Sequence, residues 1–289
     1  WTTWEVPLRQ RLPDALAAAR QKLDVAIQRQ LYRQFIFFRQ WQYLKTYAHD
    51  RGIQIIGDVP IFVAHDSADV WMNPELFFLD EYGKPTVVAG VPPDYFSPTG
   101  QLWGNPLYRW NVHSASGYAW WLARIKAVLQ MVDIIRIDHF RGFAGYYEVP
   151  GDAATAEHGR WVPAPGQDFF TRVRDALGDL PILAEDLGVI TPDVEDLRDS
   201  FDLPGMRIFQ FAFGSGPSYA FLPHHYPQQC VVYTGTHDND TALGWYKRVS
   251  GEEKQFYNRY MDRDGSHVSW EMIRGAWSSV AVFALAPIQ

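Results

Sequence analysis

The stretch that decides the fold is "VDIIRIDHFRG", Val132 to Gly142. Its first half is an apolar run rich in isoleucine, and its second half adds Arg136, Asp138, His139 and Arg141 within six residues. Successive side chains of a strand alternate between two faces, so Arg136 and Asp138 share one face at a spacing of about 6 to 7 Å. At that spacing a guanidinium can hold a carboxylate in its ionised form. The stretch therefore predicts a buried strand with charged residues at its carboxyl end.

Helices and strands alternate on both sides of this stretch. The run "IQIIGDVPIF", residues 53–62, indicates a strand before it, and the apolar runs after it indicate four more. Repeated β-α order with apolar strands predicts a parallel sheet covered by helices. The expected strands are 133–138, 181–185, 206–211, 230–234 and 280–285, and the expected helices are 114–131, 167–177, 192–200, 241–248, 252–261 and 270–277.

Three further segments complete the expected organisation. A long helical segment follows Pro13 and ends at Gly52, with a break near residues 23–25. Residues 70–112 and 142–166 have no steady hydrophobic period, and we expect both to be irregular loops or insertions. Loops of such length inside a compact domain are usually functional.

Carboxylates follow four of the six expected strands. "IQIIGD" ends in Asp58, "DIIRID" in Asp138, "PILAE" in Glu185, and "CVVYTGTHD" in His237 and Asp238. In parallel β/α sheets and barrels the reactive groups lie at the carboxyl ends of the strands. Any one of these acids could instead cap a helix or pair with an arginine. Acids that converge on one edge repel each other, however, unless their charge is used.

Two carboxylates in different protonation states are what retaining glycoside cleavage requires. The ionised one attacks the anomeric carbon, and the protonated one gives its proton to the leaving oxygen. A third acid can stabilise the positive sugar-ring transition state. In "ILAEDLG", Glu185 and Asp186 point to opposite sides, so only one of them can face such a site.

Aromatic side chains are abundant, at 16% of the chain, with 12 tryptophans. Sugars present C–H faces that dock on such rings. The loop "GVPPDYFSPTGQLWGNPLYRW" places Tyr95, Phe96, Trp103, Tyr108 and Trp110 among turn residues. Because a loop cannot bury all of them, we expect some to contact a substrate.

Composition excludes several classes of function. The chain has 33 acidic and 26 basic residues, a net charge of -7 and no basic run with interleaved aromatic residues, so we expect no nucleic-acid partner. The single cysteine, Cys230, excludes an internal disulfide and any cysteine-based metal site. No carboxylate cluster has calcium-loop spacing, so we expect no metal and no cofactor. No apolar run reaches the roughly 18 to 20 residues that span a bilayer, so we expect a cytoplasmic protein without a membrane partner.

The two ends of the chain suggest a fragment. It starts at "WTTWEVPLRQR" without a methionine and stops at "SVAVFALAPIQ", an apolar run with no loop after it. We therefore expect residues 1–289 to be part of a longer protein.

Six motifs in this order resemble the amylomaltases, or 4-α-glucanotransferases, of the α-amylase superfamily of glycoside hydrolases. They are "GDVPIFVAHDSADVW", "GVPPDYFSPTGQLWGNPLY", "IRIDHFRGF", "LAEDLGVITPDV", "DLPGMRIFQFAF" and "YTGTHDNDT". The resemblance implies an α/β fold, the (β/α)₈ TIM barrel with inserted subdomain loops. Residues 1–289 would be a truncated barrel fragment with about six of the eight strands, the third to the eighth, and 70–112 and 142–166 would be active-site loops or insertions.

The resemblance also implies roles for individual residues. Asp138 corresponds to the nucleophile and Arg136 to its electrostatic partner, Glu185 to the general acid and base, and Asp238 to the transition-state stabiliser. The other residues implied to bind substrate or support its site are Asp58, Trp103, Asn105, His139 and His237. Arg141 is expected to hold the loop after the nucleophile.

The implied reaction is transfer of α-1,4-glucan segments between malto-oligosaccharides by a retaining double displacement. Malto-oligosaccharides and α-glucans derived from starch or glycogen would be the binding partners. The catalytic carboxylates alone leave two alternatives open: an amylase-like hydrolase on the same scaffold, and a glucan-binding fragment without activity.

Overall fold

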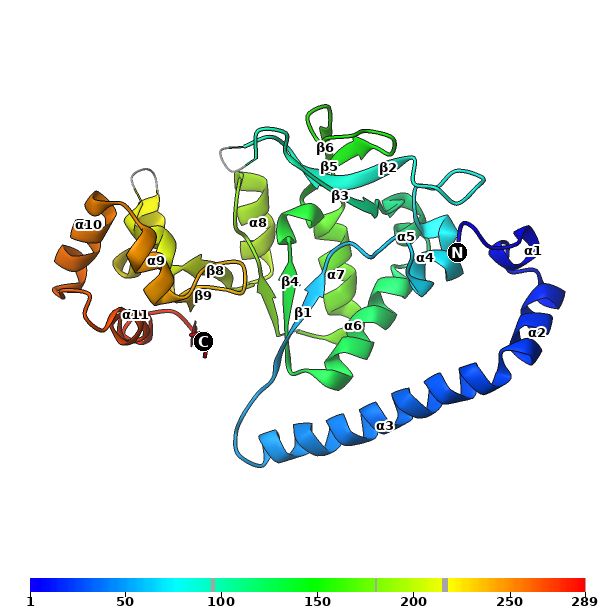
Figure 1. Cartoon of the computed structure of the whole chain (residues 1–289), viewed down its shortest axis with the longest axis horizontal. Helices are drawn as coiled ribbons and strands as arrows, with labels where there is room; N and C mark the ends of the chain where they lie inside the picture. Colours follow the sequence, from blue (N-terminus) through cyan, green and yellow to red (C-terminus); the bar gives the residue numbers. More distant parts are fainter. Residues whose placement is uncertain (95–96, 180, 215–217, 289) are drawn as a thin grey trace. The chain divides into compact units, whose positions relative to one another are not determined.

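The computed structural model of the protein describes residues 1–94, 97–179, 181–214 and 218–288 (Figure 1). The chain forms two compact units, Trp1–Pro181 and Ile182–Gln289. Within the described residues, no helix is long and apolar enough to cross a membrane.

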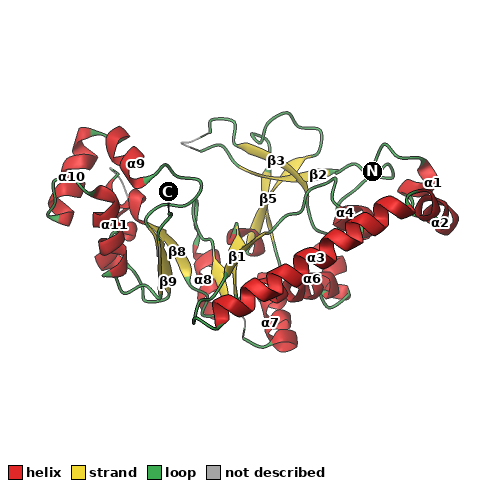
Figure 2. Cartoon of the chain, turned by 60° about the horizontal axis from the view of Figure 1, so that its bottom comes forward, coloured by secondary structure: helices red, strands yellow, loops and turns green. Residues whose placement is uncertain are grey.

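The first unit begins with the helices α1 (Val6–Arg9), α2 (Pro13–Lys22) and α3 (Asp24–His49). The predicted break near Leu23 is confirmed, since this residue separates α2 from α3. Polar contacts attach the carboxyl half of α3 to the end of helix α6 (Ala119–Met131) and the residues after it. Among them, Trp41 Nε1 donates to the Met131 carbonyl, and Lys45 Nζ donates to the Leu129 and Val132 carbonyls. Figure 2 shows α3 as a long helix beside α6. Most apolar side chains of α3 are nevertheless exposed, including Leu31, Tyr32, Phe35, Phe37, Phe38, Tyr43 and Tyr47.

A pair of parallel strands forms the barrel part of the first unit. β1 (Ile56–Pro60) pairs with β4 (Ile134–Asp138), and Asp58 lies opposite Arg136 in the register. Helix α6 (Ala119–Met131) packs on both strands and against α7 (Gly166–Leu177). The strand predicted at 133–138 is thus confirmed apart from its first residue. The helix predicted at 114–131 is two helices, α5 (Trp110–Ala115) and α6, because Gly117 and Tyr118 take positive φ angles between them.

The two stretches expected to be irregular together form a second sheet, which corrects that prediction. β2 (Val87–Val91) and β3 (Gln101–Pro106) come from the first stretch, and β5 (Gly145–Pro150) and β6 (Arg160–Pro163) from the second. They pair antiparallel in the order β3-β2-β5-β6 (Figure 1). The short elements α4 (Ala68–Met72), η1 (Pro74–Leu76) and η2 (Phe140–Phe143) complete this unit. The sequence did not indicate these strands because glycine and proline residues interrupt the alternation of apolar and polar side chains.

An aromatic cluster forms the core of the first unit. Trp110 stacks on Trp121 at 6.2 Å between ring centroids, and Phe143 stacks on Phe169 at 4.8 Å. His113 lies in the same cluster, fully buried. The cluster holds helix α6 and the start of α7 in place near the carboxyl end of β4.

The second unit contains four parallel strands in the order β7-β8-β9-β10. These are Ile182–Ala184, Gly205–Ile208, Cys230–Tyr233 and Phe283–Leu285. The strand predicted at 206–211 is wrong in its second half, because Phe209–Phe213 winds into the 3-10 helix η3. The predicted helices are confirmed as α8 (Pro192–Ser200), α9 (Ala242–Arg248), α10 (Gly251–Met261) and α11 (Val268–Trp277), and η4 (Ser218–Phe221) and η5 (Pro223–His225) are short turns.

Candidate active site

Arg136 bridges two carboxylates at the paired strands β1 and β4. Its Nη2 lies 2.9 Å from Asp138 Oδ1, and its Nη1 lies 2.6 Å from Asp58 Oδ1. The arginine side chain is buried, whereas both carboxylates are almost half exposed. Charge-assisted hydrogen bonds to a guanidinium favour the ionised form of a carboxylate. The predicted pairing of Arg136 with Asp138 is confirmed, and the arginine holds a second acid as well.

Asp58 does not end its strand, contrary to the sequence-based expectation. β1 continues for two residues beyond it, to Pro60, which lies opposite Asp138 in the register. Asp58 therefore lies directly across the ladder from Arg136. This cross-strand position explains how one guanidinium reaches both acids.

His139 and Trp103 lie edge to face beside the nucleophile candidate. Their ring centroids are 4.7 Å apart at an interplanar angle of 81°. His139 takes the left-handed conformation, with φ 54°, which turns the chain sharply after Asp138. Burial lowers the pKa of His139 to about 4, and the charge of Arg141 acts in the same direction. The imidazole is therefore neutral at pH 7, and it can donate one hydrogen bond and accept another.

The aromatic loop divides into core and surface residues. Tyr108 and Trp110 are buried in the aromatic cluster, so they are not among the aromatic residues of this loop that a substrate could contact. Trp103 keeps 37% of its surface exposed. Tyr95 and Phe96 lie outside the described residues.

Two polar residues fix the loops around this part of the site. Asn105 Nδ2 donates to the Val63 carbonyl at 3.0 Å, which ties the end of β3 to the loop after β1. The guanidinium carbon of Arg141 lies 3.8 Å from the centre of the Trp161 ring on β6, a cation–π contact. Arg141 thus holds the chain after β4 to the antiparallel sheet, as expected.

Glu185 and Asp186 follow β7 and differ in their surroundings. Glu185 is half-buried, and its Oε1 accepts the Leu187 amide at 3.3 Å. Asp186 is buried, and its carboxylate binds Arg198 and the Met206 amide. The prediction that the two side chains point to opposite sides agrees with this difference.

Asp238 and His237 lie on the loop after β9. Both side chains are about three-quarters exposed, and His237 Nε2 lies 3.5 Å from Asp238 Oδ2. Thr236 shapes the loop, because its amide and hydroxyl both donate to Asn239 Oδ1 and its hydroxyl oxygen accepts the Asp238 amide. Such a turn presents the Asp238 carboxylate to solvent.

The structure groups the expected residues within each unit. In the first unit, Arg136 binds both Asp58 and Asp138, and the His139 ring contacts the Trp103 ring. Asn105 belongs to the same unit, and Glu185, His237 and Asp238 belong to the second. Among the described residues there is no group of three or more His, Cys, Asp or Glu side chains placed to hold a metal ion.

Sequence reasoning missed the partners of Asp186. Arg198 is 12 residues away and Met206 is 20 residues away, and no motif spacing links them. The one available signal was the alternation that turns Asp186 away from Glu185.

Comparison with known proteins identifies the family. A family model described as 4-alpha-glucanotransferase matches residues 1–289. The chain belongs to the 4-alpha-glucanotransferase family. A 4-alpha-glucanotransferase of Thermus thermophilus is 52% identical over 297 residues, which cover 100% of this chain and 59% of that protein. A 4-alpha-glucanotransferase of Arabidopsis thaliana, named as chloroplastic or amyloplastic, is 46% identical over 100% of this chain and 50% of its own length.

A solved amylomaltase structure supports the fold. The amylomaltase from Streptococcus agalactiae in complex with acarbose matches with a TM-score of 0.96 at 42% identity, over 100% of this chain and 59% of that one. The predicted α/β fold, a (β/α)₈ barrel fragment with six strands, is confirmed by this likeness. The chain spans between half and three-fifths of the length of these relatives.

Proposed function

We propose that the whole protein that carries this chain is a 4-α-glucanotransferase that transfers α-1,4-glucan segments between malto-oligosaccharides. In the first half of the cycle, Asp138 attacks the anomeric carbon of the donor and Glu185 protonates the departing glucan oxygen. In the second half, Glu185 removes the proton from an acceptor 4-hydroxyl, which displaces Asp138. The anomeric configuration is retained because the carbon is inverted twice.

The remaining site residues support these two steps in our proposal. Asp238 stabilises the positive charge that develops on the sugar ring. His237 binds hydroxyl groups of the donor sugar, and His139 with Trp103 forms a wall for the acceptor side. Asp58 and Asn105 hold the supporting structure, through Arg136 and the Val63 carbonyl respectively.

The contact between Arg136 and Asp138 is the single observation that carries the proposal. A nucleophilic carboxylate must be ionised, and the guanidinium at 2.9 Å favours the ionised form. The half exposure of Asp138 makes its carboxylate accessible to a sugar. An acid of this kind, on a chain that belongs to the 4-alpha-glucanotransferase family, is best explained as the nucleophile of that reaction.

Incubation of the whole protein with maltotriose tests the proposal. Transfer yields glucose together with malto-oligosaccharides longer than maltotriose, without a rise in total reducing ends. Maltose and glucose alone, with rising reducing ends, would show a hydrolase instead. An Asp138→Asn variant should lose at least about 10³-fold in rate because the covalent intermediate cannot form. A variant that kept full activity would contradict the assignment.

The partners and location follow from the same proposal. We propose malto-oligosaccharides and α-glucans derived from starch or glycogen as substrates, and the cytoplasm as the location. The one cysteine, Cys230, is buried and reduced, which fits a reducing compartment. Cell fractionation with an antibody against the whole protein would test the location.

A further inference from the structure

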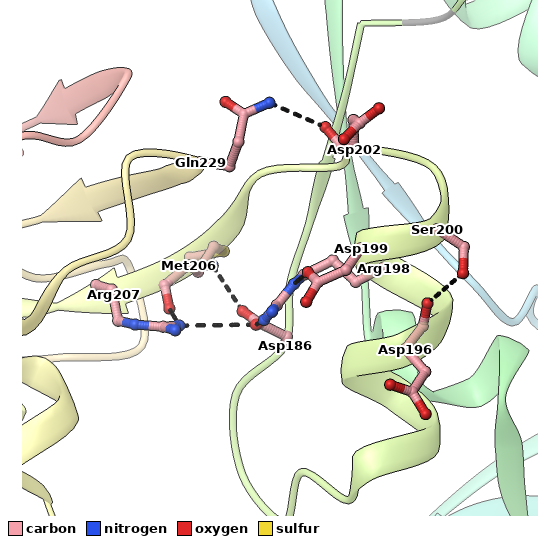
Figure 3. Close-up of polar contacts among 9 residues, drawn as sticks. All are labelled: Asp186, Asp196, Arg198, Asp199, Ser200, Asp202, Met206, Arg207 and Gln229. Atoms are coloured by element: carbon pink, nitrogen blue, oxygen red, sulfur yellow. Dashed lines mark hydrogen bonds and ion pairs between the residues drawn. The ribbon is translucent and has the colours of Figure 1, made fainter.

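Asp186 is enclosed by donors from two other elements of the second unit (Figure 3). Its Oδ2 accepts Arg198 Nη1 from α8 at 2.5 Å, and its Oδ1 accepts the Met206 amide of β8 at 2.6 Å. Arg207 Nη1 lies 3.6 Å from Oδ2 on the other side. The residue is only 5% exposed, so these contacts are formed away from water. The carboxylate is therefore fixed in position from three directions.

The Asp186 carboxylate also accepts a hydrogen bond from β8 at a point where the main-chain ladder between β7 and β8 has ended. β7 ends at Ala184, which lies opposite Gly205 of β8. Beyond that point the side chain of Asp186 accepts the Met206 amide, a donor that main-chain carbonyls satisfy in a regular ladder. The chain can thus leave the sheet directly after β7 and still remain attached to β8.

Gly205 shows how closely the carboxylate is fitted. A methyl group at this position would lie 2.5 Å from Asp186 Oδ2, far inside van der Waals contact. A side chain there would push the carboxylate off its donors. The absence of a side chain at Gly205 is therefore part of the Asp186 site.

Glu185 precedes Asp186 directly, so the same anchor limits where Glu185 can point. Successive side chains of an extended segment project to opposite sides. With Asp186 held in the interior, Glu185 is directed away from it, and Glu185 is correspondingly half-buried rather than enclosed. A displacement of about 1 Å in a proton donor can cost on the order of 10²-fold in rate.

We propose that Asp186 is the positioning residue for the general acid and base Glu185. The proposal rests on the proposed function, because it assigns Asp186 a task only if Glu185 transfers the proton. Arg198, Arg207 and the Met206 amide act through Asp186, and none of them needs to touch the substrate.

The test compares two donors in the whole protein, because they differ in their need for a proton. Maltotriose requires protonation of its leaving oxygen, whereas α-maltotriosyl fluoride releases fluoride with little assistance. In the first step Asp138 forms a bond to the anomeric carbon and the carbon–fluorine bond breaks, with the electron pair leaving on fluoride. The burst of fluoride release therefore reports that step without the acid. The ratio of the two rates in one preparation does not depend on the fraction of folded enzyme.

Asp186→Asn should lower kcat on maltotriose by about 10²-fold, leave KM within about threefold, and leave the fluoride burst within about threefold. Azide, which needs no general base, should restore turnover of the fluoride. Gly205→Ala, which keeps the charge and displaces the carboxylate, should show the same selective loss to a smaller degree, and it stays informative if Asp186→Asn does not fold.

Asp199→Asn is the matched control. Asp199 binds the same Arg198, through Nε at 2.7 Å, but its side chain is 65% exposed. Its loss should leave both rates within about twofold.

Two results would overturn the proposal. If Asp186→Asn and Gly205→Ala reduced both rates equally, or neither rate, Asp186 would be structural only. Glu185→Gln separates this failure from that of the proposed function, because it should also lose maltotriose transfer and keep the fluoride burst. If Glu185→Gln showed no such selectivity, Glu185 would not be the acid and base, and both proposals would fall.

Discussion

Arg136 Nη1 lies 2.6 Å from Asp58 Oδ1, directly across the β1–β4 ladder. This contact fixes the guanidinium so that its other nitrogen meets Asp138 at 2.9 Å. The ionised nucleophile candidate is therefore oriented by a residue about eighty positions earlier in the chain. Asp58 lies in the middle of β1, and Arg136 connects it to Asp138 at the carboxyl end of β4.

Arg136→Lys should lower kcat of the whole protein on maltotriose by about 10²-fold or more. A lysine carries one compact charge and cannot form two separate hydrogen bonds to Asp58 and Asp138 in the fixed geometry of a guanidinium. Arg160→Lys is the control in the same unit, because Arg160 pairs with Glu148 at 2.7 Å and is 76% exposed. An Arg136→Lys enzyme as active as the Arg160→Lys enzyme would contradict the role of the shared guanidinium.

Arg198→Ala should lower the free energy of unfolding by about 3 to 5 kcal/mol, because it leaves the Asp186 charge buried without its main partner. Burial opposes the charge of Arg198, but its hydrogen bond with Asp199 and the charge of Asp186 outweigh burial and raise its pKa. Urea unfolding measures the change. Arg248→Ala, which removes an exposed pair with Asp240, should cost at most about 1 kcal/mol. Equal losses for the two variants would argue against a buried network.

His113→Phe should make stability less dependent on pH. Burial lowers the pKa of His113 to about 4, against a smaller opposing effect of the Leu76 carbonyl. Among the described residues, neither ring nitrogen has a partner with full hydrogen-bond geometry. The unfolded chain binds this proton near pH 6.5, so stability falls as pH decreases from about 6.5 towards 4. At pH 5 the histidine costs about 2 kcal/mol relative to pH 7.

Unfolding curves at pH 7 and pH 5 measure this effect. The difference between the two pH values should shrink by about 2 kcal/mol in His113→Phe. Trp120→Phe, a change in a ring 5.9 Å from His113 that does not titrate, should lower stability equally at both pH values. An unchanged difference in His113→Phe would show that His113 binds a proton as readily in the folded protein as in the unfolded chain.

Trp103→Ala should raise KM for maltotriose about fivefold, because one aromatic contact is worth on the order of 1 kcal/mol. Trp103→Phe keeps a ring against His139 and should recover most of this loss. Tyr82→Ala, an exposed aromatic residue of the same unit, serves as the control. If both variants at Trp103 bound maltotriose as the unmodified protein does, the wall formed by Trp103 and His139 would not contact substrate.

Short sequence patterns predicted the features that depend on residues close together in the chain. The alternation in "VDIIRIDHFRG" was sufficient for the strand and for the contact between Arg136 and Asp138. The antiparallel sheet was missed because its central pairing joins Val87 to Pro150, and its strands contain glycine and proline. The burial of Tyr108 was missed for a similar reason, since turn residues surround it in sequence while aromatic rings surround it in space.

The antiparallel sheet has a consequence for the order of folding in the first unit. β2 and β5 lie on either side of β4 in the chain, so their pairing closes a loop of about sixty residues that contains the strand of the nucleophile candidate. Loop closure of this length costs entropy before the new contacts compensate, which makes the pairing a late, non-local step. A change in the length of one inserted stretch, 70–112 or 142–166, alters the strand register in which it pairs with the other. We therefore expect natural variation in the two lengths to be correlated.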